Sequence, residues 1–84
     1  MPEKHWKTFL LLTGAEPEDK HDGKAAIRVF KLHDSDRYSI EFGYSHRPKG
    51  FMGIRFLPYN RSEEFADLLE RAIDAIEADR KKGE

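Results

Sequence analysis

The chain has 84 residues, of which 37% are charged and 38% hydrophobic, with a formal net charge of −1 and no cysteine. A chain of this length forms one domain, residues 1–84, near the lower size limit for a self-sufficient core. The lack of cysteine excludes disulfides and thiolate metal sites, and no run approaches the roughly 20 apolar residues that span a bilayer. We therefore expect a soluble, cytoplasmic protein that gains additional stability as a homodimer.

Four segments have the composition of β-strands. They span residues 5–12, 25–32, 38–45 and 51–57. Residues 38–45 show the clearest pattern, because aromatic and branched side chains occupy every second position. Short connections rich in Gly, Pro, Asp and Ser separate the last three segments. Such connections favour an antiparallel meander.

The last segment, about residues 61–81, has the pattern of one long amphipathic helix. Asn60 or Ser62 can cap its start, and Glu63 stands at the spacing of a capping box with Asn60. Acidic residues in the first turn and basic residues in the last turn suit the helix dipole. One apolar stripe runs along it: Phe65, Leu68, Leu69, Ala72, Ile73 and Ile76. The sequence therefore predicts an α+β fold, β-β-β-β-α, with the helix packed on one face of a four-stranded antiparallel sheet.

Charge is divided unevenly along the chain. Seven acids lie between Asn60 and Asp79, whereas no acid occurs from Phe42 to Arg61. The acid-free segment carries His46 and four arginine or lysine residues: Arg47, Lys49, Arg55 and Arg61. This asymmetry is compatible with an anionic ligand held away from the helix. A solvated helix face beside a charged loop is the alternative explanation.

Alternation of side chains along strands predicts two faces of the sheet. The face toward the helix is expected to carry mostly apolar residues: Trp6, Leu10, Leu12, Ile27, Val29, Tyr38, Ile40, Phe42, Met52, Ile54 and Phe56. The second face is expected to carry phenylalanines interleaved with basic residues: Lys7, Phe9, Leu11, Arg28, Phe30, Phe51 and Arg55. A plain solvated face would instead be mostly Thr, Lys, Glu and Ser.

Two interpretations account for the second face. Aromatic rings stack on unpaired bases while neighbouring Lys or Arg neutralise the phosphates, which predicts a single-stranded nucleic-acid site. Its candidate residues are Lys7, Phe9, Arg28, Phe30, Arg47, Lys49, Phe51 and Arg55. Alternatively, a second protomer or another partner covers the phenylalanines, because large exposed apolar patches mark interfaces. The two interpretations are compatible with each other if one end of the second face lies in a dimer interface and the other end is open to nucleic acid.

Three motifs resemble those of known single-stranded nucleic-acid binders. They are Tyr38-Ser-Ile-Glu-Phe, Gly53-Ile-Arg-Phe and Phe65-x-x-Leu-Leu-x-x-Ala-Ile, within residues 25–76. The chain resembles the Pur-alpha-like, Whirly-like and transcriptional-positive-cofactor-four-like proteins, and in particular the small bacterial Pur-alpha-like proteins. The resemblance implies a homodimer that binds single-stranded DNA or RNA with little sequence preference, without catalysis and with Arg28, Phe30 and Arg55 as contacts. The chain departs from that pattern in its slightly acidic charge and in the acidic loop 16–22.

Catalytic and metal-binding patterns are not evident. The four histidines are scattered, and none forms an i, i+4 pair on a helix. His33, Asp34 and Asp36 read as turn residues rather than cation ligands. Glu41 is the one acid expected on the second face, where it favours an ion pair with Arg28 or Arg55 over a role as a general base. We expect neither an enzyme nor a bound metal or cofactor.

Overall fold

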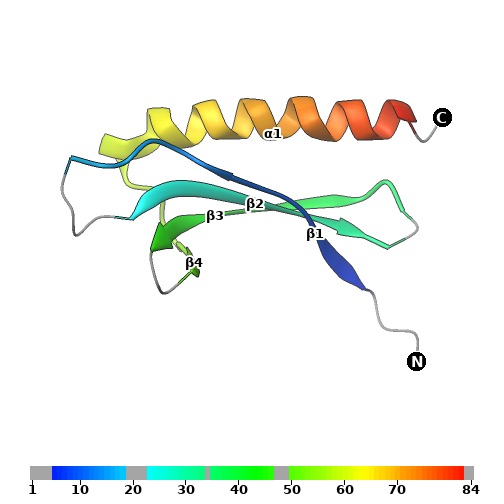
Figure 1. Ribbon diagram of the computed structural model, residues 1–84, viewed down its shortest axis with the longest axis horizontal. Coiled ribbons are helices and arrows are strands. Elements are labelled where there is room, and N and C mark those ends of the chain that lie inside the picture. Colours follow the sequence, from blue (N-terminus) through cyan, green and yellow to red (C-terminus); the bar gives the residue numbers. More distant parts are fainter. Residues whose placement is uncertain (1–4, 19–22, 34, 47–49, 83–84) are drawn as a thin grey trace.

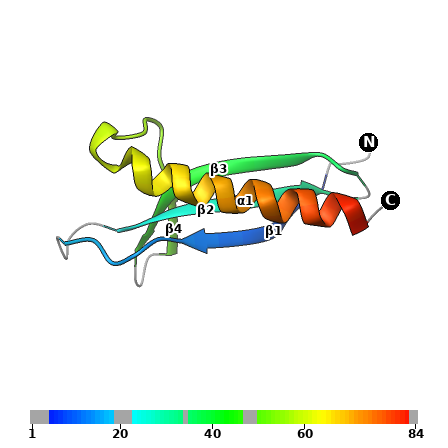
Figure 2. The ribbon, with the colours of Figure 1, turned by 90° about the horizontal axis from the view of Figure 1, so that it is seen from above.

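The computed structural model describes residues 5–18, 23–33, 35–46 and 50–82. Four antiparallel strands lie side by side in chain order: β1 (Trp6–Thr13), β2 (Lys24–Leu32), β3 (Tyr38–His46) and β4 (Gly50–Gly53). A 3-10 turn, η1 (Tyr59–Arg61), leads into the helix α1 (Ser62–Lys82). The helix lies along one face of the sheet (Figure 1, Figure 2). The predicted α+β meander followed by a C-terminal helix is confirmed.

The core lies between α1 and the middle of the sheet. From the helix, Phe65, Leu68 and Ala72 are buried, and they meet buried side chains of β2, namely Ala25, Ile27 and Val29. The Phe65 ring makes T-shaped contacts with the Phe42 and Tyr44 rings, whose centroids lie 6.0 and 5.7 Å from its own. The predicted stripe is wrong at one position, because Ile73 is 42% exposed. Ile73 lies on the flank of the helix, outside the contact with the sheet.

Arg61 fastens the start of the helix to the sheet. Its Nη1 donates to the carbonyl oxygen of Gly23 (2.9 Å), and its guanidinium lies 4.9 Å from the centre of the Tyr44 ring. Its Nε also donates to Glu64 (2.9 Å), which holds the pKa of that carboxyl below its usual range. The predicted capping box is replaced by the 3-10 turn, and the Ser62 hydroxyl donates to the carbonyl of Tyr59. Arg61 therefore holds the start of α1 against the sheet, and it is not simply a member of the basic segment 42–61.

Asp79 fastens the other end of the helix. The Lys31 amine and the Tyr38 hydroxyl both donate to Asp79 Oδ2, the former at 2.6 Å. These hydrogen bonds, first that from Lys31, hold the pKa of the Asp79 carboxyl below its usual range. The same carboxylate raises the pKa of Lys31 and that of Tyr38. The three side chains join β2, β3 and the last turns of α1.

This network predicts a pH-dependent stability. A folded-state pKa below that of the unfolded chain, about 3.9 for Asp, stabilises the fold above that pH. We expect Asp79→Asn to lower the free energy of unfolding at pH 7 and the difference from the wild type to shrink as the pH falls through the lowered pKa. Urea unfolding at pH 7 and pH 3 measures it. Asp74→Asn, at an exposed position of the same helix, should change little at either pH; an equal loss from both variants would contradict the assignment.

A β-bulge in β1 reverses the predicted sides of its first half. Thr8 pairs with Phe30 and Leu10 with Val29, so Phe9 is an extra residue in the ladder. A bulge places one unpaired residue and changes the phase of alternation on either side of it. Phe9 packs against the core and contacts the Tyr38 ring at 5.7 Å. The predictions for Phe9, Lys7 and Trp6 are therefore wrong by one position.

The fourth strand is shorter than predicted. It pairs with β3 from His46↔Gly50 to Gly43↔Gly53, and the Ile54 amide still donates to the carbonyl of Phe42 at 3.0 Å. Beyond that point the chain leaves the sheet, so Arg55, Phe56 and Leu57 do not belong to a strand. Phe56, predicted to face the helix, is 81% exposed. Residues 51–57 alternate in the sequence, but only residues 51–53 of this segment pair with β3 in the ladder.

Candidate functional site

One face of the sheet has no described element over it (Figure 1). Residues opposite each other in an antiparallel ladder point to the same side. The registers Leu11↔Arg28, Arg28↔Glu41 and Trp6↔Leu32 therefore place these side chains together, away from α1. We call this the uncovered face. Its principal side chains are Trp6, Thr8, Leu11, Arg28, Phe30, Leu32, Ser39, Glu41, Ser45 and Phe51.

Arg28 is at the centre of a cluster on the uncovered face. Its guanidinium carbon lies 4.8 Å from the centre of the Phe30 ring and 4.5 Å from the centre of the Phe51 ring. Its Nη2 and Nε donate to Glu41 Oε1 at 2.7 and 3.1 Å. Two cation–π contacts and an ion pair thus hold the guanidinium beside the two rings on the uncovered face. The predicted pairing of Glu41 with Arg28 is confirmed.

Two glycines make room for this cluster. A Cβ atom on Gly43 would lie 2.6 Å from Cζ of Phe51 and 2.4 Å from the carbonyl oxygen of Met52. The Phe51 ring can therefore lie over the backbone of β3 only because residue 43 has no side chain. Across the ladder, a Cβ on Gly53 would lie 2.8 Å from Glu41 Oε2. The absence of side chains at Gly43 and Gly53 therefore leaves room for the Phe51 ring and the Glu41 carboxylate.

The eight predicted site residues fall into four groups. Arg28, Phe30 and Phe51 come together on the uncovered face, as predicted. Phe9 lies in the core, and Lys7 pairs with Lys31, whose amine reaches the helix, so both belong to the opposite side. Arg55 is exposed but lies beyond β4. Arg47 and Lys49 lie outside the described residues.

Trp6 is the aromatic residue that sequence reasoning assigned to the wrong face. It pairs with Leu32 and is 40% exposed, so it extends the aromatic surface toward the β1 edge. Only the extra residue at Phe9 brings it there, and no glycine or proline in β1 signals the bulge. Phe56 was misplaced for a different reason, since the alternation of residues 51–57 suggested a strand; Tyr59 follows that predicted strand and was given no role.

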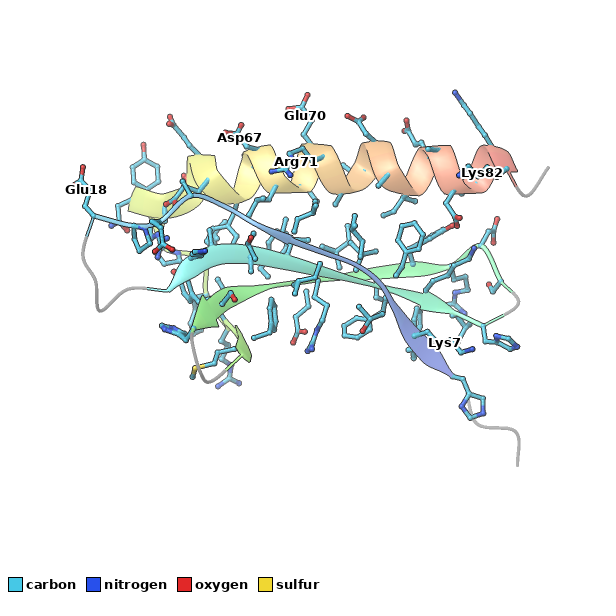
Figure 3. The ribbon with its side chains drawn as sticks, in the orientation of Figure 1. Lys7, Glu18, Asp67, Glu70, Arg71 and Lys82 are labelled. Carbon is cyan, nitrogen blue, oxygen red and sulfur yellow. The ribbon has the colours of Figure 1, made fainter. Side chains whose placement is uncertain are left out.

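The two layers of the molecule differ in charge. Residues 23–61, from β2 to the start of the helix, carry eight basic and three acidic side chains, whereas residues 62–82 carry four basic and seven acidic ones. On α1, Asp67 and Glu70 point away from the sheet (Figure 3). Coulomb attraction of an anionic ligand therefore favours the sheet layer over the outer side of the helix.

Comparison of the chain with models of protein families, with curated proteins and with solved structures finds no match. Among the described residues, no three His, Asp or Glu side chains gather as metal ligands would. In the same part of the chain, no helix is long and apolar enough to cross a membrane.

Proposed function

We propose that the protein binds single-stranded nucleic acid on its uncovered face. The observation that carries this proposal is the cluster of Arg28 with Phe30 and Phe51. Both rings are half-buried, so part of each remains open to a ligand. Base–aromatic stacking contributes about 1–3 kcal/mol per base and accepts any base. Binding with little sequence preference follows from such a platform.

Arg28 supplies the contact to phosphate. The Arg28 and Glu41 side chains of this pair are 34% and 40% exposed, and a pair screened by water to that extent contributes little to stability. An incoming phosphate can therefore replace the Glu41 carboxylate, because the two N–H groups that share Glu41 Oε1 can donate to phosphate oxygens instead. Glu41 acts as an internal competitor of the ligand.

A titration of a fluorescent single-stranded oligonucleotide at 50 and 200 mM salt tests the proposal, with the matching duplex as control. We expect a preference for the single strand and weaker binding at the higher salt, because phosphate contacts release counterions. Arg28→Gln should weaken binding and reduce the salt dependence, whereas Glu41→Gln should strengthen it. Arg71→Gln removes the same charge from the exposed helix and serves as the matched control. Equal binding by the Arg28 and Arg71 variants would refute the site.

A second candidate function is recognition of a protein partner by the same face. Trp6 and Leu11, at 40% and 48% exposure, favour it because they add apolar area next to the cluster. Such an interface responds weakly to salt, unlike one that depends on phosphate. If no oligonucleotide binds at low salt, this candidate replaces the first.

A further inference from the structure

The isolated chain exposes more surface than a compact protein of its size. Its accessible area is 6714 Å², while a folded monomer of 9.8 kDa exposes about 5,200 Å². The radius of gyration, 14.1 Å, likewise exceeds the value of about 12 Å for 84 residues. A standard protein interface covers about 800 Å² of each partner. The excess area is therefore enough to form one stable interface.

Exposed apolar side chains are concentrated in one region. Of the seven large hydrophobic residues that are prominently exposed in the described ranges, four lie in residues 52–59: Met52, Phe56, Leu57 and Tyr59. Phe56 and Tyr59 are 81% and 92% exposed. This connection from β4 to α1 passes outside β3, on the side of the helix away from β1 (Figure 2).

Ile73 extends the apolar region along the helix. Arg71 lies on the near flank of α1, the flank toward β1 (Figure 3). At 100° per residue, Ile73 lies about 200° further around the helix, which places it on the opposite flank, toward β3. The exposed Ile73 thus lies on the same side of the molecule as the connection 54–59.

The edge of the sheet on this side is also open. Because β4 pairs only with residues 43–46 of β3, no described strand lies beside residues 38–41. Unpaired strand edges are templates for another chain unless lysine, proline or a bulge protects them. Residues 38–41, Tyr-Ser-Ile-Glu, contain no lysine or proline, and their ladder with β2 is regular. The outer backbone edge of residues 38–41 therefore has no pairing strand among the described residues.

We infer that a second copy of this chain covers this side, which we call the β3-side surface: residues 38–41 of β3, the connection 54–59 and Ile73. A second copy fits because the excess area, about 1,500 Å², exceeds the roughly 800 Å² that one interface covers on each partner, and because a two-fold axis pairs the same apolar patch with itself. The uncovered face then remains free in the dimer. This assignment does not depend on the nucleic-acid proposal, since it comes from a different surface.

Sedimentation equilibrium of the full chain and two leucine variants tests the inference. Leu57 and Leu11 are 47% and 48% exposed, but they lie on the β3-side surface and on the uncovered face respectively. We expect a wild-type dimer whose dissociation constant rises by at least about a hundredfold in Leu57→Glu, because each dimer then buries two unpaired charges. Leu11→Glu should leave the dimer intact. Ile73→Glu provides an independent variant at the far end of the surface, and circular dichroism establishes that each variant is folded.

Each result has a distinct meaning. A monomeric wild type at all concentrations overturns the inference, as does a dimer that Leu11→Glu dissociates and Leu57→Glu does not. In the latter case the uncovered face is the interface, and the nucleic-acid proposal loses its surface. If oligonucleotide binding fails while Leu57→Glu dissociates the dimer, the functional proposal fails alone.

Discussion

Phe65→Ala is expected to lower the free energy of unfolding by about 3–5 kcal/mol. Phe65 is 1% exposed and is the largest of the fully buried side chains. Its loss removes contacts with both the Phe42 and Tyr44 rings and leaves a cavity under the helix. Because native proteins are stable by only about 5–15 kcal/mol, this loss is a large fraction of the total free energy of unfolding. Urea unfolding followed by circular dichroism measures the change.

Ile73→Ala is the control for this prediction. Its side chain is 42% exposed and alanine is the better helix former, so we expect a loss below about 1.5 kcal/mol in the monomer. The apolar stripe alone predicts similar losses at both positions. Equal losses would show that the helix packs on a different flank from the one described.

Gly43→Ala is expected to damage the candidate site while leaving the rest of the sheet folded. The added methyl group would meet the Met52 carbonyl oxygen and the Phe51 ring, so β4 must move away from β3. Overpacking of this kind costs about 1–3 kcal/mol. Phe51 is then displaced from Arg28, and we expect oligonucleotide affinity to fall roughly fivefold to a hundredfold, the equivalent of one lost stacking contact.

Gly53→Ala is the matched control, since Gly53 is the ladder partner of Gly43. Its added methyl group meets only the end of the Glu41 side chain, which can rotate away. Stability should change little, and binding should be unchanged or stronger, because a displaced Glu41 competes less with the ligand for Arg28. If Gly53→Ala is as harmful as Gly43→Ala, the backbone contact of β4 with β3 does not explain the effect. Amide chemical shifts of β4 and β2 would show whether the displacement is local.

The fold was predictable because each local pattern agrees with the packing that it enters. Alternation in residues 38–45 is carried unbroken into the ladder with β2. The predicted apolar stripe of the helix is confirmed at the buried positions Phe65, Leu68 and Ala72. It failed at Ile73, since periodicity identifies an apolar side of a helix but not the width of the surface that it meets.

The candidate site was predicted only in its centre. Arg28, Phe30 and Phe51 come from regular stretches of strand, where alternation is a reliable guide. Lys7 and Phe9 were misplaced because an extra residue in a ladder leaves no mark in the composition of β1. Arg55 was misplaced because β4 ends where Ile54 turns from the ladder toward the core, and apolar alternation continues past that point.

The extra residue at Phe9 also changes how β1 aligns with an unbulged strand. Residues 10–13 and residues 6–8 match such a strand in two different frames, separated by a gap of one residue. An ungapped alignment would equate Trp6 with a core position and Phe9 with a surface position. Deleting Phe9 would join the two frames into one continuous ladder, from Trp6↔Leu32 to Thr13↔Ala26, and would keep Trp6 on the uncovered face and Lys7 on the helix side. A relative that keeps this residue but pairs it in a regular ladder would instead present a lysine where this chain presents an indole.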